Sequence, residues 1–235
     1  MDSALPMPGP AAKTIDEVIA RMQSIDAVLP ASDGVACFNR MYLGVTLAVG
    51  RLVEQGSFAD PAFVSHLDVV FANRYFEAVD AMSGPLSVVP VAWRPLLEAR
   101  SRPGIEPIQF ALAGMNAHIN HDLPLAVVRT CAQLSTAPTD GSHHDDYRKV
   151  DALLDASEQS VRESFEPEDV AIVDRHMSAV TNLVANWSIN TARDVAWDTA
   201  VALWEVRDFS FATHLLTDAL AHTVAMASRG LLLAV

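Results

Sequence analysis

The stretch Thr14-Ile-Asp-Glu-Val-Ile-Ala-Arg-Met-Gln-Ser-Ile25 shows how this chain is built. Thr14 and Glu17 have the spacing of a capping box, in which two side chains bond backbone amides at the start of a helix. Apolar residues then recur at the spacing of one helix face, at Ile15, Val18, Ile19, Met22 and Ile25. The sequence therefore predicts a helix that begins at Thr14 and ends before Pro30 and Gly34.

Similar start and stop signals continue along the chain. Asp60 and Pro61 are typical of an N-cap and a first helical residue, and Gly230 is typical of a helix stop. Five prolines between residues 84 and 107 allow only short helices there. Further helices are predicted over residues 35–55, 60–83, 108–121, 124–134, 145–165, 167–185, 190–206 and 209–229. We therefore predict an all-α, single-domain bundle of about 8–10 helices over residues 14–235, with largely buried central helices and a flexible tail over residues 1–13.

The composition excludes several classes of protein. The 235 residues include 29 acidic and 16 basic side chains, a formal net charge of -13, which disfavours nucleic acid and anionic membrane surfaces as partners. The most apolar run, Met41 to Val49, is too short to span a bilayer, and the N-terminus lacks the basic and apolar segments of a signal peptide. We therefore expect a soluble, cytoplasmic protein.

Well-known catalytic motifs are missing from the sequence. It has no Gly-x-Gly-x-x-Gly, Walker A lysine motif, His-Glu-x-x-His, Cys-x-x-Cys or Gly-x-Ser-x-Gly. It also lacks the Glu-x-x-His pairs that hold di-iron centres in ferritin-like bundles. We therefore expect no nucleotide cofactor, and the chemistry has to be sought in other polar residues.

Polar residues interrupt an apolar segment at Gly114-Met-Asn-Ala-His-Ile-Asn-His-Asp-Leu-Pro124. Buried polar groups cost free energy unless they are paired, so this cluster needs a reason. His118 and Asp122 are four residues apart and share one face of a continuous helix. They are either a catalytic histidine with its orienting carboxylate, two ligands of a divalent metal, or part of a structural polar knot. Pro124 predicts that the helix kinks or that Asp122 caps a new one.

Asp68 and Tyr75 are seven residues apart and share a helix face with Phe71. A carboxylate on this apolar face has a raised pKa if it has no partner, which suits a general acid. The alternative is a structural ion pair with Arg74 or Arg193. Arg193 also precedes Trp197 by four residues, a spacing that favours a guanidinium over the indole ring.

A second His-x-x-x-Asp occurs at His214 and Asp218, followed by His222 at the same spacing. Facing the first motif across two helices, it would build a dinuclear metal site. A solvated stripe on the outer face of a helix is the alternative, because separate apolar positions such as Leu215 and Leu216 provide a packing face.

The run Asn116-Ala-His-Ile-Asn-x-Asp-Leu123 resembles the signature of an uncharacterised bacterial family, a domain of unknown function. The segments Met41–Thr46, Phe71–Tyr75 and Ala192–Trp197 are also similar to that family. The resemblance implies an all-helical single domain and brings no established reaction.

These observations favour an enzyme acting on a small molecule in a pocket between helices. The expected reaction is non-redox, of the isomerase, cyclase, lyase or hydrolase type, with a place in specialised metabolism; the chain is compatible with a homo-oligomer. The expected catalytic residues are His118, Asp122 and Asp68, and the expected substrate-binding residues are Asn116, Asn120, Tyr75, Arg74, Arg193 and Trp197. One alternative is a metal-dependent hydrolase with His118, Asp122, His214 and Asp218 as ligands. The other is a non-catalytic binding protein whose polar motif is structural.

Overall fold

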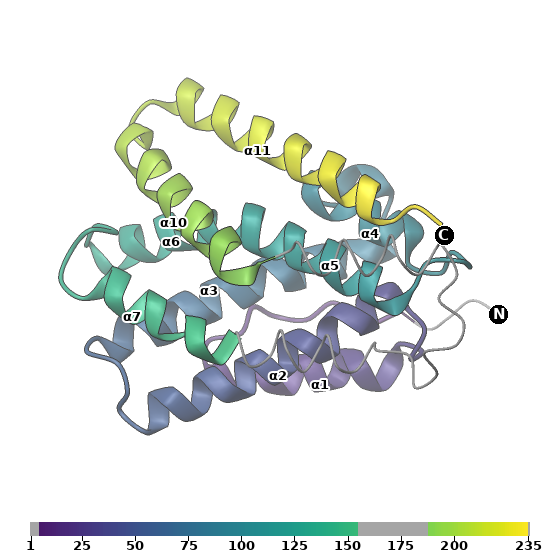
Figure 1. Cartoon of the computed structure of the whole chain (residues 1–235), viewed down its shortest axis with the longest axis horizontal. Coiled ribbons are helices and arrows are strands. Elements are labelled where there is room, and N and C mark those ends of the chain that lie inside the picture. Colours follow the sequence, from purple (N-terminus) through teal and green to yellow (C-terminus); the bar gives the residue numbers. More distant parts are fainter. Residues whose placement is uncertain (1–4, 155–187, 235) are drawn as a thin grey trace.

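The computed structural model describes residues 5–154 and 188–234, and the helices predicted within these ranges are present (Figure 1). The fold is an all-α bundle, as predicted. Its α-helices are α1 (Ile15–Val28), α2 (Gly34–Glu54), α3 (Pro61–Asp80), α4 (Arg94–Ala99), α5 (Pro107–Ala117), α6 (Leu123–Leu134), α7 (His143–Lys149), α10 (Ile189–Val206) and α11 (Ser210–Leu231). The predicted helix over residues 167–185 and most of the one over 145–165 lie outside the described residues.

Two predicted helix starts, at Thr14 and Asp60, are confirmed by their capping hydrogen bonds. The Thr14 side chain accepts a hydrogen bond from the Glu17 amide at the start of α1, and the Asp60 side chain accepts one from the Phe63 amide at the start of α3. The proline-rich stretch forms short helices, as expected: α4 and the 3-10 helices Ala81–Ser83, Leu86–Val88 and Val91–Trp93.

The segment before α1 contacts the bundle. Ala12 is buried, and its backbone amide and carbonyl both form hydrogen bonds with the Asn73 side chain on α3. The expected flexible tail is therefore anchored at this point. None of the helices in the described ranges is both long enough and apolar enough to cross a membrane.

Two glycines bring α2 and α5 together. Phe110 lies against Gly34, and Phe38 lies against Gly114, where a Cβ atom would come within 2.4 Å of the Phe38 ring. These two contacts occur in the same order along both helices, so α2 and α5 run in the same direction. The aromatic contacts Phe38–Tyr75 and Tyr42–Phe71 occur in opposite order, so α3 runs antiparallel to α2.

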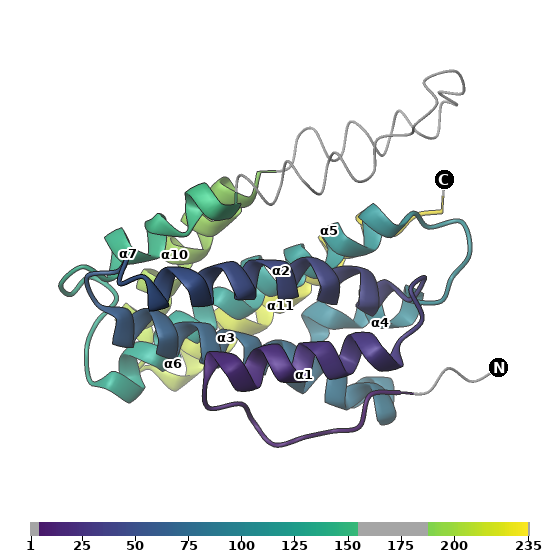
Figure 2. The same cartoon turned by 90° about the horizontal axis from the view of Figure 1, so that it is seen from below.

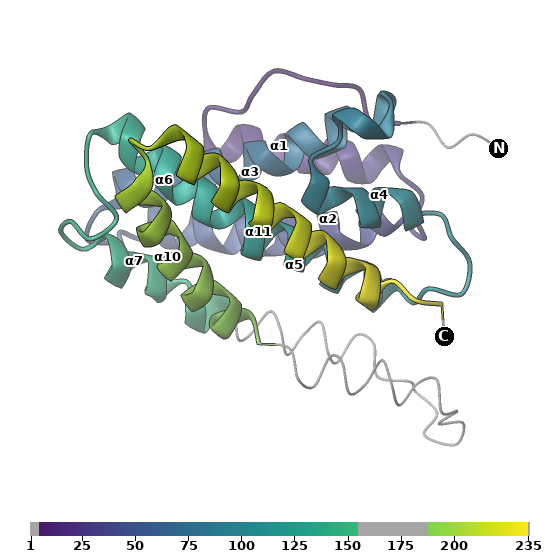
Figure 3. The same cartoon turned by 90° about the horizontal axis from the view of Figure 1, so that it is seen from above.

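The remaining helices cover this central group. Figure 2 shows α1 on one side of α2, and α7 and α10 on the other. Figure 3 shows α11 crossing over α5, and these two helices are in direct contact. Because of this covering, α5 is buried along almost its whole length, which agrees with the prediction of buried central helices.

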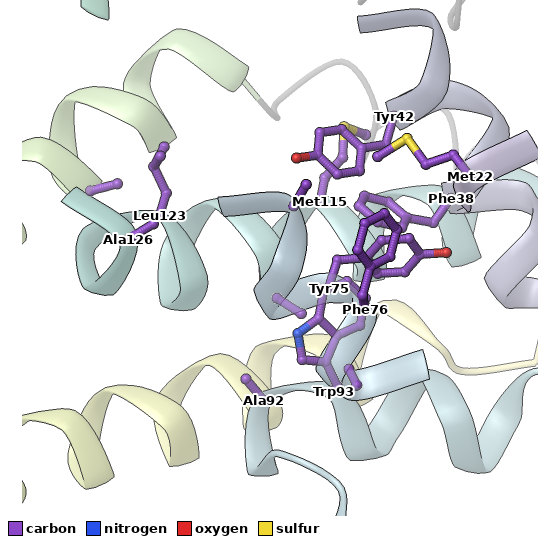
Figure 4. Close-up of a cluster of buried hydrophobic side chains, with 14 of the residues drawn as sticks. Met22, Phe38, Tyr42, Tyr75, Phe76, Ala92, Trp93, Met115, Leu123 and Ala126 are labelled. Carbon is purple, nitrogen blue, oxygen red and sulfur yellow. The ribbon is translucent and has the colours of Figure 1, made fainter. Parts of the chain in front are cut away.

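An aromatic cluster fills the space between α2, α3 and α5 (Figure 4). The Phe38 ring makes edge contacts with Tyr75, Trp93 and His118. Trp93 and Tyr75 are almost completely buried. The polar motif that interrupts α5 therefore begins inside the core.

Candidate functional site

The chain between α5 and α6 is continuous and widens into one π-helical turn, His118–Asp122. The Leu123 amide bonds to the His118 carbonyl five residues back, instead of four. In a regular α-helix the ring of Pro124 would clash with the carbonyl of Asn120, and the wider turn provides room for it. Asp122 has helical backbone angles and its side chain makes no capping hydrogen bond, so the alternative in which Asp122 caps α6 is wrong.

Asp122 is the centre of a buried hydrogen-bond network. Its Oδ2 atom lies 3.1 Å from Nδ1 of His118 and 2.9 Å from Nε1 of Trp93, and its Oδ1 atom lies 2.8 Å from Nδ1 of His121. His118 and Asp122 are both 2% exposed. The contact that their spacing predicts is therefore present, and it is withdrawn from water.

The network fixes the charges of both groups. Burial alone would raise the pKa of Asp122, but hydrogen bonds from His118 and His121 outweigh it and hold the pKa well below its ordinary value. Burial lowers the pKa of His118, and the nearby Arg74 charge adds to this, although the bond to Asp122 acts in the opposite direction. At neutral pH the pair is therefore a carboxylate and a neutral imidazole. Because the carboxylate accepts from Nδ1, the proton is on Nδ1 and the lone pair is on Nε2.

The imidazole ring of His118 is held by aromatic neighbours. Phe71 stacks on it with ring centroids 3.6 Å apart, and the Tyr42 ring meets it at 4.5 Å. Its Nε2 atom is buried and has no hydrogen-bond partner in the part of the chain that the structure describes. A buried nitrogen that has no partner is costly, so it is a candidate for contact with a ligand.

A cavity of about 110 Å³ lies beside His118, between α2, α3, α5, α7 and α10. Its wall is mostly apolar. Two more buried oxygen atoms in this wall, Oη of Tyr42 and Oδ2 of Asp68, have no partner among the described residues. The cavity wall thus includes His118, Tyr42 and Asp68, and each has a buried polar atom without a partner among the described residues.

Asp68 is the acidic group of this wall. Burial raises its pKa to about 7. Within residues 5–154 and 188–234, no ion pair joins it to Arg74 or to Arg193, so the alternative of a structural ion pair is wrong for these two partners. A carboxyl group that is partly protonated at neutral pH can act as a proton donor.

The other expected substrate-binding residues are mostly engaged in the fold. Asn116 donates to the Val224 carbonyl and the Ser228 hydroxyl of α11, and it accepts from Asn120. Tyr75 donates to Asn39 in the core. None of Asn116, Asn120, Tyr75, Arg74 and Trp197 is part of the cavity wall.

Arg193 does line the cavity, but its guanidinium is occupied. It lies 2.9 Å from Asp151, donates to the Tyr147 carbonyl, and sits 4.0 Å over the Tyr147 ring. The predicted pairing with Trp197 is therefore wrong, because the Trp197 ring contacts His144 and Tyr147.

The second His-x-x-x-Asp motif lies apart from the first. His214 and Asp218 are exposed on α11, where Asp218 is 3.7 Å from His222. Across the described ranges there is no group of three or more histidine, cysteine or acidic residues arranged to hold a metal ion. The expected dinuclear arrangement is therefore not formed by these residues.

Sequence reasoning missed three neighbours of the motif. Trp93 bonds to Asp122 from the proline-rich stretch, where no pattern links it to a residue 29 positions away. Phe71 and Tyr42 lie in segments that resemble the family, yet the sequence offers no sign that their rings enclose His118. Helical spacing alone cannot show contacts between different helices.

The fold and site define an all-α protein with a buried His–Asp pair beside an apolar cavity. The model of the family described as "Family of unknown function (DUF5995)" matches residues 15–234. The chain belongs to this family. Neither the curated proteins nor the solved structures include a match to this chain.

Proposed function

We propose that this protein is a non-redox enzyme that moves a proton on a small carbonyl compound bound in the cavity. The observation that supports this most is the Nε2 atom of His118, buried without a partner among the described residues beside the cavity while Nδ1 is held by Asp122. A neutral imidazole with an orienting carboxylate is a general base. Isomerisation, cyclisation and elimination are the reaction types that such a base serves.

The proposed proton transfer uses three residues. His118 Nε2 removes a proton from the carbon next to the carbonyl group, and the Asp122 carboxylate stabilises the imidazolium that forms. Protonated Asp68 gives its proton to the carbonyl oxygen, which yields a neutral enol. When the substrate has a carbon–carbon double bond next to that carbon, return of the His118 proton to the far end of this double bond, and of the enol proton to Asp68, moves the double bond into conjugation with the carbonyl group and restores both side chains.

Deuterium exchange provides a direct test. Cyclohexanone incubated with the protein in D₂O should exchange its α-protons at least about tenfold faster than in buffer alone, because general-base catalysis typically contributes a factor of 10² or more. His118→Gln should abolish this excess, and His214→Gln on the exposed face of α11 is the matched control. A folded wild-type protein without any excess exchange would favour the non-catalytic alternative.

The metal-dependent alternative is less well supported by the geometry. Both oxygens of Asp122 already accept hydrogen bonds, from Trp93, His118 and His121, and are therefore less available to a cation. Exchange activity should accordingly survive treatment with EDTA. Its loss with EDTA, and recovery with zinc or manganese, would instead support a metal site that uses Nε2 of His118.

A further inference from the structure

Tyr42 belongs to the cavity wall, but the proposed proton transfer does not use it. Its hydroxyl oxygen is buried and has no hydrogen-bond partner within residues 5–154 and 188–234. Thr46, one turn further along α2, donates its own hydroxyl proton to the backbone carbonyl of Tyr42. A buried hydroxyl without a partner is costly, so this atom is a candidate for contact with a ligand.

The Tyr42 hydroxyl keeps its proton at neutral pH and can therefore donate a hydrogen bond. Burial raises its pKa well above the ordinary value, and the negative charges of Asp68 and Asp122 add to this, whereas Thr46 acts in the opposite direction. The hydroxyl proton therefore needs an acceptor, and a carbonyl oxygen is one. The Nε2 atom of His118 differs in this respect, because in the neutral ring it is itself an acceptor.

Tyr42 is held beside the groups of the proposed reaction. Its ring centroid lies 4.5 Å from that of His118 and 5.8 Å from that of Phe71. Asp68 is one turn before Phe71 on α3 and belongs to the same cavity wall. Figure 4 shows the Tyr42 side chain with its hydroxyl pointing away from Met22. The phenol, the base and the acid thus come from α2, the π-helical turn and α3, which surround one cavity.

The size of the cavity and a nearby charge restrict the ligand. A cavity of about 110 Å³ is comparable with a cavity of about 150 Å³ that binds benzene, so it takes a small molecule. Arg74 is close enough to His118 for its charge to lower the histidine pKa, and its buried Nε atom has no partner among the described residues. Arg74 is not part of the cavity wall, so its charge acts at a distance. That charge favours a build-up of negative charge on a ligand atom near His118.

We propose that the Tyr42 hydroxyl donates a hydrogen bond to the carbonyl oxygen of the substrate, as a second donor besides Asp68. A carbonyl oxygen has two lone pairs and can accept from both groups. The hydrogen bond from Tyr42 strengthens as the oxygen gains negative charge in the transition state, so it lowers the barrier to proton removal. Tyr42 keeps its proton throughout, and the proton transfers between the substrate, His118 and Asp68 stay as described.

This proposal rests on the proposed function and adds the class of substrate, small β,γ-unsaturated ketones. The two donors require a carbonyl oxygen, and the base requires a C–H group next to it. The isomerisation requires a carbon–carbon double bond one position further, and the mostly apolar wall suits the remaining carbon atoms. Allyl methyl ketone has all of these features, and its isomer, methyl propenyl ketone, is conjugated.

The isomerisation of allyl methyl ketone is followed by the ultraviolet absorption of its conjugated product. Tyr42→Phe should lower kcat about a hundredfold or more, the loss that follows removal of an oxyanion donor. It should raise KM by no more than about tenfold, because a single hydrogen bond to the uncharged ketone is weaker. Its melting temperature should not fall, because the lost hydroxyl has no partner among the described residues. A kcat equal to that of the wild type would overturn the proposal.

Tyr75→Phe is the matched control. The Tyr75 hydroxyl donates to Asn39 in the core and is not part of the cavity wall. The control should therefore show the opposite pattern, with a lower melting temperature and a kcat within about twofold of the wild type. An equal loss of kcat in Tyr75→Phe and Tyr42→Phe would show a general effect of altered packing and would contradict the proposal.

The carbonyl stretching band of bound ¹³C-labelled butanone reports the hydrogen bond without any reaction. A hydrogen bond to a carbonyl oxygen lowers its stretching frequency. Part of the shift seen with the wild type should therefore be lost in Tyr42→Phe and kept in Tyr75→Phe. An unchanged band in Tyr42→Phe, or no band from bound butanone in the wild type, would overturn the proposal.

The two measurements separate this inference from the proposed reaction. If the band depends on Tyr42 but the wild type neither isomerises allyl methyl ketone nor exchanges the protons of cyclohexanone, the binding role of Tyr42 stands and the reaction fails. If the wild type is active and Tyr42→Phe is equally active with an unchanged band, the reaction stands and the role of Tyr42 fails. If cyclohexanone exchanges protons but allyl methyl ketone is not isomerised, the substrate class fails.

Discussion

Phe71 lies face to face with His118, with ring centroids 3.6 Å apart and an angle of 6° between the planes. The stacking partner lies on α3, and the carboxylate of Asp122 that accepts the hydrogen bond from His118 lies in the π-helical turn itself. Together they hold the imidazole in one orientation, in which Nδ1 meets the carboxylate and Nε2 is buried with no partner among the described residues. Such a fixed ring needs no reorganisation when a ligand arrives, which is the property expected of a preorganised base.

The protonation state of His118 can be observed directly. Long-range ¹H–¹⁵N NMR should show a neutral ring protonated on Nδ1 at pH 7, and protonation of Nε2 should occur only below the ordinary histidine pKa of about 6.5. Burial is the main reason, because it disfavours the charged imidazolium. His118→Gln assigns the signals by their loss. An imidazolium signal at pH 7 would contradict the proposed base.

Trp93→Phe tests the network around Asp122. The substitution keeps a buried aromatic ring but removes the donor 2.9 Å from Oδ2, so the free energy of unfolding should fall by about 1–3 kcal/mol. Urea denaturation measures the change. Trp204→Phe is the control, because that half-buried indole contacts the Arg207 guanidinium on the outside of α10. An equal loss of unfolding free energy in both variants would show that the hydrogen bond from Trp93 to Asp122 contributes no measurable stability of its own.

Much of the fold follows from local sequence signals. Thr14 and Asp60 mark helix starts where the structure has them, because capping depends on residues within one turn. The pairing of His118 with Asp122 also follows from spacing along one helix. The π-helical turn does not: Pro124 predicts a disturbance, but several local geometries relieve the same clash.

Contacts between helices are where sequence reasoning fails. Trp93 and Asp122 are far apart in the chain, and the sequence contains nothing that pairs them. Arg193 illustrates the same limit, because its four-residue spacing to Trp197 suggested a partner while the folded chain supplies Asp151 and Tyr147. Spacing along one helix therefore indicates which side-chain contacts are possible, and the packing of the helices determines which of them form.

Asp68→Asn should change how stability depends on pH. The pKa of Asp68 is about 7 in the folded protein and about 3.9 in an unfolded chain, so between these values the folded state binds more protons. Its contribution to stability is therefore fully present below about pH 4 and is lost as pH rises to about 7. The asparagine side chain cannot ionise, so it does not show this loss. From about pH 5 to about pH 8, the free energy of unfolding of the variant should therefore rise by about 3 kcal/mol relative to that of the wild type.

Denaturation at about pH 5 and about pH 8 measures that gain. Asp218→Asn, on the exposed face of α11, controls for the removal of a carboxylate from the surface. If the stabilities of Asp68→Asn and the wild type stay parallel over this range, the carboxyl group is not desolvated.

Gly114→Ala should disrupt the contact that places Tyr42 beside His118. The added Cβ would lie 2.4 Å from the Phe38 ring, closer than any real contact, and Phe38 cannot yield because Tyr75 and Trp93 pack on it. We expect a loss of about 1–3 kcal/mol in the free energy of unfolding, the range for an overpacked core.

Gly44→Ala is the matched control for this substitution. Gly44 is also within a helix, but apart from its chain neighbours and the nearby backbone of α2 no atom lies within 4 Å of the position that a Cβ atom would take there, so alanine should stabilise α2 by about 0.5–1 kcal/mol. The two variants should therefore differ in sign, and exchange of cyclohexanone protons should fall for Gly114→Ala alone. If Gly114→Ala proved as stable and as active as Gly44→Ala, the close approach of α2 to α5 would not be what positions the site.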